Sequence, residues 1–218
     1  MAASGTRRAG RPRTAVLTRE RITVNALELV SDDGYESLTM QRLAKSLGVS
    51  PSALYNHVES KHALMQWIQE LIMTEVDTSV FDTKPLRDAL ISWSTNYRNI
   101  FSRHIPLIPI IAVLPVSDSP GTLEMYERVA QGLTSYGLKE EAIIPTIVAL
   151  ESFIFGSAMD TAAPHDIFDT SNHQDLTPHF TKAVAAQRET KINTSDDSFQ
   201  RGLTAMVDGL LEAGKNHD

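Results

Sequence analysis

The sequence predicts an all-α protein: an N-terminal head of three helices built around a helix-turn-helix, followed by a larger C-terminal helical body. Apolar residues recur with the period of a helix, about 3.6 residues, and no segment shows the strict alternation of a strand. Helix start and stop signals follow one another closely within residues 18 to 64. The 218 residues are enough for one or two domains with a core.

The helix-turn-helix is expected from two short helices, at about 39 to 47 and 51 to 57. Gly48 between them accepts positive φ without a Cβ clash, and Ser50 and Pro51 then supply an N-cap and a first helical residue. This arrangement is typical of DNA-binding proteins. A tight helical hairpin inside an ordinary bundle is the alternative, but bundle helices are usually longer.

The other helices follow from apolar periodicity and from capping residues. Three prolines must break the stretch 104 to 118, because an internal proline removes a backbone donor and clashes with the preceding turn. Residues 161 to 175 lack helical periodicity and are expected to form a polar loop. The remaining predicted helices span about 18–33, 60–78, 84–102, 120–136, 139–160, 176–190 and 195–213.

Composition excludes several classes of protein. There is no cysteine, which rules out a disulfide framework, thiol catalysis and cysteine-ligated zinc. The most apolar run, residues 105 to 116, is too short to span a membrane and contains prolines. The N-terminus lacks the apolar stretch of a signal peptide. We therefore expect a soluble, cytoplasmic protein without a membrane partner.

Charge is distributed unevenly along the chain. The net charge is −7, from 20 Lys and Arg against 27 Asp and Glu. Residues 1 to 65 hold nine basic and six acidic residues, a balance of +3, so the remainder holds 11 and 21, a balance of −10. A basic head suited to nucleic acid is therefore joined to an acidic body.

Short motifs in the first third of the chain match a known pattern. They are ALELV at 26–30, Gly34, LT at 38–39, RLAKSLGV at 42–49, LYNHV at 54–58 and KHAL at 61–64. In these residues the head resembles the TetR family of bacterial transcriptional repressors. A weaker similarity extends through the helix at 138–160 and the last helix, which contains SFQRGLTAMVDGLL.

The resemblance implies both an organisation and a function. It implies a flexible basic arm at residues 1–17, a helix-turn-helix DNA-binding domain at 18–64, and a ligand-binding and dimerisation domain at 65–218. It also implies a ligand-responsive repressor that binds a palindromic operator in double-stranded DNA as a homodimer and is released by a small-molecule effector. No cofactor and no enzymatic activity are expected. A DNA-binding regulator without an effector is the alternative.

The family pattern places the helix that begins at Pro51 in the major groove. By position, Gln41, Ser52, Ala53 and Asn56 would face base edges, and their chemistry agrees, since Gln and Asn can pair with adenine and Ala can touch a thymine methyl. Packing or solvation is the alternative for the aromatic residues. The other residues assigned to DNA are Thr39, Tyr55 and His57 at the backbone or groove wall, Lys61 at a phosphate, Arg42 and Ser50 beside them, and Arg11 and Arg13 of the arm in the minor groove.

The body supplies candidates for an effector pocket. Large side chains lie at helical spacing on the segments that the family uses to surround its ligand, so we expect a largely apolar effector. Plain core packing is the alternative for each of them. The candidates are Trp93, Tyr97, Phe101, His104, Met125 and Phe155, with Arg103 and Glu151 as polar anchors.

Two helices carry wide apolar stripes that predict a homodimer. Paired with their copies, they would form a four-helix interface with two-fold symmetry. The stripe residues are Ile143, Ile144, Ile147, Leu150, Ile154 and Phe155 on one helix, and Phe199, Leu203, Met206, Val207 and Leu210 on the other.

A metal-dependent helical enzyme is the remote alternative. It would rest on His165, Asp166, Asp169 and His173, whose side chains are metal ligands. These residues lie in a polar loop without fixed helical spacing, so a solvated loop is preferred and no metal site is predicted.

Overall fold

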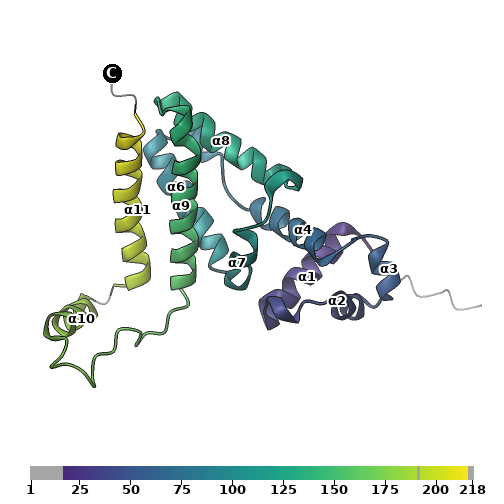
Figure 1. Ribbon diagram of the computed structural model, residues 1–218, viewed down its shortest axis with the longest axis horizontal. Helices are drawn as coiled ribbons and strands as arrows, with labels where there is room; N and C mark the ends of the chain where they lie inside the picture. Colours follow the sequence, from purple (N-terminus) through teal and green to yellow (C-terminus); the bar gives the residue numbers. More distant parts are fainter. Residues whose placement is uncertain (1–16, 191, 216–218) are drawn as a thin grey trace, which may run out of the picture.

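The computed structural model describes residues 17–190 and 192–215, and within these ranges the protein is helical, with no strand (Figure 1). The all-α prediction is confirmed. Helices α1 to α4 form the head and its connection, and the remaining helices form the body. The elements of the head are α1 (Arg19–Asp33), η1 (Tyr35–Ser37), α2 (Met40–Leu47), α3 (Pro51–Tyr55) and α4 (Lys61–Met73).

The helix-turn-helix forms where the caps predict it. The side chain of Thr39 accepts the N–H of Arg42 at the start of α2. Gly48 ends α2 with φ at 70° and ψ at 32°, in the left-handed region that a Cβ disfavours. The N–H of Val49 then bonds back to the carbonyl of Ala44 at 2.9 Å, which completes a Schellman closure. The turn between the helices is therefore encoded locally.

A small apolar core holds the head together. Leu43 and Leu47 of α2 and Leu54 of α3 are almost fully buried. They join Ile22 and Ala26 of α1, which are 0 % exposed, in one continuous cluster. The two short helices thus pack on α1 and are positioned as a unit.

Two helices end earlier than their patterns predict. Helix α3 ends at Tyr55, so Asn56 is its C-cap rather than an interior residue. Helix α4 ends at Met73 instead of continuing to residue 78. There the chain tightens into a turn, and the side chain of Asn96 on α6 accepts the N–H of Asp77 at 2.8 Å. A contact from a distant helix thus holds the chain in a turn where periodicity alone predicts that the helix continues.

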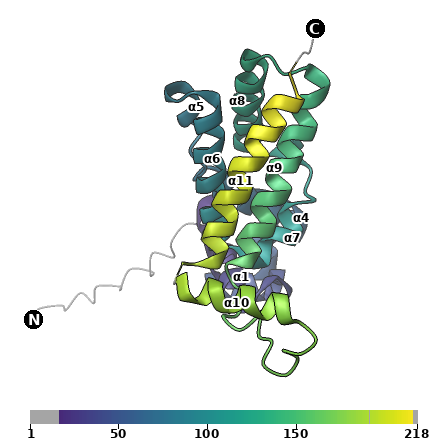
Figure 2. The same ribbon diagram turned by 90° about the vertical axis from the view of Figure 1, so that its left-hand side faces the viewer.

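The body is a bundle centred on α6 (Leu86–Phe101). Figures 1 and 2 show α9 and α11 side by side along the face of the body remote from the head. The proline-rich stretch forms short helices, as predicted. The other elements are α5 (Val80–Thr83), η2 (Ile105–Leu107), α7 (Ile108–Ile111), η3 (Val116–Asp118), α8 (Pro120–Tyr136), α9 (Glu140–Asp160), α10 (Pro178–Thr190) and α11 (Thr194–Ala213).

Helix α9 is, of the described helices, the one long and apolar enough to cross a membrane, and 33% of its most apolar window is buried. It packs against α6, α8 and α11. Leu150 and Ile154 of α9 are 0 % exposed in that core. Helix α9 is therefore a core helix that also keeps an apolar outer surface, not a membrane span.

Candidate DNA-binding head and effector site

The surface of α2 and α3 presents most of the residues assigned to DNA. Gln41, Ser52, Asn56 and His57 are exposed, and Tyr55 is 51% exposed. Ala53 is half-buried. Amide, hydroxyl and imidazole groups of α2, α3 and the turn after α3 are therefore accessible at the surface of the head.

Thr39, Ser50 and Arg42 also have structural roles that the sequence assignment did not include. The hydroxyls of Thr39 and Ser50 cap α2 and α3. The guanidinium of Arg42 forms an ion pair with Asp33 at the end of α1. The two caps leave the hydroxyl hydrogens free to donate to phosphate. Arg11 and Arg13 lie outside the described residues.

Lys61 is fixed at the first position of α4. Its Nζ donates to the carbonyl of Tyr35 at 3.3 Å and lies 3.7 Å from the centre of the Tyr35 ring. The ammonium has three donors, so two remain for a phosphate. Lys61 therefore both stabilises the head and presents a positive charge at a helix N-terminus.

Five of the eight predicted pocket residues come together inside the body. The rings of Trp93 and Tyr97 on α6 lie 5.5 Å apart, and those of Tyr97 and Phe101 lie 5.2 Å apart. Phe155 of α9 contacts both Tyr97 and Phe101, at 5.7 and 5.0 Å. The carboxylate of Glu151, one turn earlier on α9, accepts a hydrogen bond from the hydroxyl of Tyr97. We call the rings of Trp93, Tyr97, Phe101 and Phe155 the aromatic column.

Glu151 is the polar centre of this region. Its carboxylate accepts the hydroxyl of Tyr97 at 3.1 Å and that of Tyr126 on α8 at 2.8 and 3.0 Å. Burial raises the pKa of Glu151, although the two phenol bonds act in the opposite direction. Burial and the nearby carboxylate also raise the pKa of Tyr97 and Tyr126. Tyr126 was not predicted from the sequence as part of this site. The available signal was that it directly follows Met125, a predicted pocket residue.

The other predicted pocket residues occupy different places. Met125 is buried on α8, at 2% exposure. Arg103 is exposed and pairs with Glu75 after α4, so it lies outside the interior. His104 is half-buried, and burial together with the charge of Arg103 lowers its pKa. The prediction of Arg103 as a polar anchor of the pocket does not match this exposed position.

Several buried polar atoms in the body have no hydrogen-bond partner within the described part of the chain. They lie on α4, on α6 and the turn after it, and around the start of α8. Such groups are costly unless a partner such as water, an ion or a ligand satisfies them. They are Gln69 Oε1, Trp93 Nε1, Ser94 Oγ, His104 Nδ1, Ser119 Oγ and Thr122 Oγ1.

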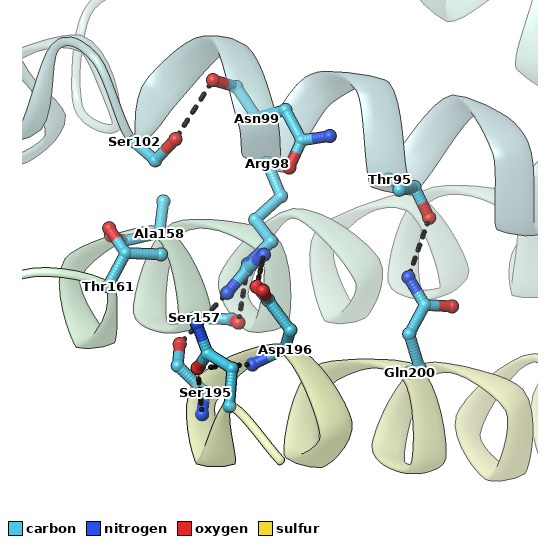
Figure 3. Close-up of polar contacts among 11 residues, drawn as sticks. Thr95, Arg98, Asn99, Ser102, Ser157, Ala158, Thr161, Ser195, Asp196 and Gln200 are labelled. Carbon is cyan, nitrogen blue, oxygen red and sulfur yellow. Dashed lines mark hydrogen bonds and ion pairs between the residues drawn. The ribbon is translucent and has the colours of Figure 1, made fainter. Parts of the chain in front are cut away.

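Arg98 links α6 to α9 and α11, and this role was not predicted from the sequence. Figure 3 shows its guanidinium reaching from α6 to Ser157 on α9 and to Ser195 and Asp196 at the start of α11. The three bonds measure 3.0, 2.9 and 2.7 Å respectively, and the Arg98 side chain is 5% exposed. The guanidinium also lies 4.8 Å from the ring of Phe199. This contact set fixes α11 against the core.

The apolar stripes face differently from the prediction. Phe199, Leu203 and Val207 of α11 are almost fully buried within the same subunit, against α6 and α9. They are therefore core residues of the subunit, because this side of α11 packs against α6 and α9. Met206 and Leu210 of the same predicted stripe are only partly buried. Four residues of the predicted α9 stripe are buried in the same way, namely Ile143, Ile147, Leu150 and Ile154. Of this stripe Ile144 is 66% exposed, and Val148, which the prediction did not include, is 53% exposed.

The polar loop carries the four candidate metal ligands His165, Asp166, Asp169 and His173. Within residues 17–190 and 192–215, no group of three His, Asp or Glu side chains is close enough to hold a metal ion. His165 and His173 are exposed, and Asp169 accepts bonds from Ser171. The side chains of residues 161–175 are mostly exposed because this loop extends away from the bundle (Figure 2).

Comparison with known proteins agrees with this architecture. A model of bacterial regulatory proteins of the tetR family matches residues 22–67, and a model of the tetracyclin repressor-like C-terminal domain matches residues 82–213. The class C tetracycline repressor protein of Escherichia coli is 28% identical over 202 residues, which cover 89% of this chain and 90% of the repressor.

Solved structures show the same fold. Apo ActR of Streptomyces coelicolor is 26% identical, with a TM-score of 0.76 over 94% of this chain and 98% of ActR. ActR in complex with (S)-DNPA is 26% identical, with a TM-score of 0.73 over 92% and 100%. Both family models lie on the head and body described above. The chain therefore belongs to the TetR family, and it is a DNA-binding transcriptional regulator and not an enzyme.

Proposed function

We propose that this protein is a cytoplasmic, ligand-responsive repressor that binds a palindromic operator as a homodimer and is released by a small-molecule effector. The observation that carries the proposal is a helix-turn-helix whose polar side chains are exposed, joined through α4 to a body with a partly polar aromatic interior. Support comes from ActR, a relative whose structure is known in complex with (S)-DNPA.

In this proposal, the exposed side chains of α2 and α3 read the operator. Gln41 and Asn56 have amides that can form paired hydrogen bonds with adenine, and Lys61 supplies a phosphate contact. Position 56 lies at the C-cap, where the side chain is not confined by a following helical turn. The same head on a second subunit would occupy the next major-groove face, about 34 to 36 Å away.

The dimer is proposed to form through the outer faces of α9 and α11. Ile144, Val148 and Met159 on α9 are 66%, 53% and 48% exposed, which is unusual for apolar side chains on a core helix. On α11, Gly209 has open space where a Cβ would stand, so another helix can approach closely. A second copy of the same face would cover both surfaces.

Effector binding is proposed to act through α4 and the proline-rich stretch. Helix α4 is bonded to the start of α8 by Glu70 and Gly121, and its Gln66 donates to Asp118 at 3.0 Å. Element η2 of the proline-rich stretch contacts α1 of the head. A ligand that moves α8 or η2 would therefore change the position of the head, provided that it binds the two conformations with different affinity.

The test is selection of bound sites from random double-stranded DNA by the full-length protein. We expect recovery of an inverted repeat whose half-sites are separated by one helical turn. Enrichment of single, unpaired half-sites would contradict a dimer, and the absence of enrichment would contradict sequence-specific binding.

A constitutive regulator without an effector is the second candidate. It is favoured by the close packing of the aromatic column, in which Trp93 and Phe101 are 0 % exposed. Titration of the protein–operator complex with candidate ligands separates the two, because a constitutive regulator is not released.

A further inference from the structure

Glu151 is a buried carboxylate without a positive counter-charge. Its partners are the hydroxyls of Tyr97 and Tyr126. Among the described residues it forms no ion pair, and no Lys, Arg or His contributes to its pKa. Removing a carboxylate from water is costly when no opposite charge accompanies it. When it is ionised, this carboxylate therefore has no ion-pair partner among the described residues.

The groups around this carboxylate are aromatic. Tyr97 and Tyr126 hold its oxygens, and Phe155 lies one turn further along α9, in edge contact with Tyr97. Trp93 and Phe101 flank Tyr97 on α6. The faces of such rings attract cations.

The residues on one side of this carboxylate are partly exposed at the surface of the subunit. Glu151, Tyr126 and Phe155 are each only partly buried, whereas Tyr97 behind them is 2% exposed. An ionised carboxylate has about four acceptor positions, and the two hydroxyls do not use all of them. The acidic balance of residues 66 to 218, 11 basic against 21 acidic residues, would also favour the approach of a cation.

We propose that Glu151, together with Tyr97, Tyr126 and Phe155, binds the positively charged group of an organic cation, such as an ammonium attached to an aromatic or apolar body. This rests on the proposed function, in which the body binds an effector, and it gives that effector a chemical class. The cation supplies the missing counter-charge to Glu151, while the rings contact its apolar part. A neutral molecule of equal shape gains only the ring contacts.

The simpler interpretation is that Glu151 only holds two tyrosines in place. In that case a glutamine, whose carbonyl oxygen still accepts phenol hydrogens, would serve as well. The charge of the ligand would then have no influence on its affinity. The two interpretations differ in how affinity depends on the charge of the ligand and on the charge of residue 151.

The experiment uses a pair of probes matched in shape: naphthylmethyl-trimethylammonium and its uncharged carbon isostere, in which the nitrogen is replaced by carbon. Binding to the full-length protein is measured by calorimetry. We expect the ammonium to bind wild type at least tenfold more tightly than the isostere. In Glu151→Gln the preference should fall to within about twofold, while in Glu141→Gln, an exposed carboxylate on the same helix, it should persist.

Three results would overturn the inference: equal binding of both probes by the wild type, an unchanged preference in Glu151→Gln, or no binding of either probe. Thermal unfolding followed by circular dichroism verifies that each variant is folded. Operator release is measured separately with the same probes. Ammonium binding that depends on Glu151 but leaves the operator bound would support the cation site and contradict the proposed regulation. Release of the operator by the neutral probe alone would support the proposed regulation and contradict the cation site.

Discussion

The carboxylate of Glu70 on α4 accepts the backbone N–H of Gly121 at the start of α8, with its two oxygens at 2.9 and 3.2 Å. Negative charge is favoured at a helix N-terminus, and Gly121 permits the approach because a Cβ there would stand 2.9 Å from Glu70 Oε1. Helix α8 also carries Tyr126, which bonds to Glu151. The contact of Glu70 with Gly121 and the bond of Tyr126 to Glu151 thus link α4, which leads to the head, through α8 to the polar centre of the body.

We predict that Glu70→Ala uncouples the effector from the operator. Operator affinity without ligand should remain within a few-fold of wild type, but a ligand that releases wild type should release the variant much less. The free energy of unfolding should fall by about 1 kcal/mol, the contribution of a partly exposed hydrogen bond. Gly121→Ala should act in the same direction by displacing the carboxylate. Operator titrations with and without ligand measure the coupling, with Glu124→Ala on the exposed side of α8 as control.

Lys61→Ala and Asn56→Ala should affect DNA binding differently. Loss of the ammonium should weaken all sequences about equally and lower the salt slope by about one unit. Loss of the amide should relax preference at particular base pairs, at a cost of about 1 to 3 kcal/mol. Because Lys61 also contacts Tyr35, the folding of its variant must be verified. Indistinguishable specificity profiles for the two variants would show that these roles are wrong.

Ile144→Asp should dissociate the dimer without unfolding the subunit. The side chain is 66% exposed in the single subunit, so the carboxylate becomes buried only when a second copy covers it. Leu203→Ala is the matched contrast, because Leu203 is 0 % exposed and its truncation should cost about 2 to 5 kcal/mol of subunit stability. Light scattering and urea unfolding distinguish the two effects. A dimeric Ile144→Asp protein would place the interface on another face.

The raised pKa of Glu151 predicts how stability depends on pH. A carboxyl whose pKa is higher in the folded than in the unfolded chain contributes stability below its unfolded pKa of about 4.3, and this contribution is lost as pH rises through the folded pKa. Wild type should therefore lose stability relative to Glu151→Gln as pH rises above about 4.3. Melting temperatures of the two proteins across this range test the sign, and parallel curves would contradict it.

Arg98→Met should lower the free energy of unfolding by about 1 to 3 kcal/mol, since it removes bonds to Ser157 and Ser195 from a buried position. The ion pair with Asp196 adds little, because that carboxylate is 58% exposed. Arg201→Met, which removes an exposed pair with Asp197, should cost at most about 1 kcal/mol. Equal losses in urea unfolding would show that the contacts of Arg98 are no stronger than a surface pair.

The sequence by itself determined the elements whose signals are local. Thr39 and Ser50 cap α2 and α3, and Gly48 closes the turn between them, because each acts on backbone within a few residues. The motifs around these residues were also sufficient to identify the family. Helix α8 spans the predicted residues 120–136 for the same reason, with a proline at its start and a glycine at its end.

Only the tertiary structure decided which side of each helix faces which neighbour. Helical periodicity marks Val207 and Ile144 equally as apolar, but packing against α6 and α9 buries Val207 inside the subunit, while Ile144 stays exposed. The bond of Glu151 to Tyr126, 25 residues away, and that of Arg98 to Asp196, 98 residues away, depend on how distant helices meet. A periodic stripe specifies that a face is buried, but the partner that buries it is fixed by long-range packing.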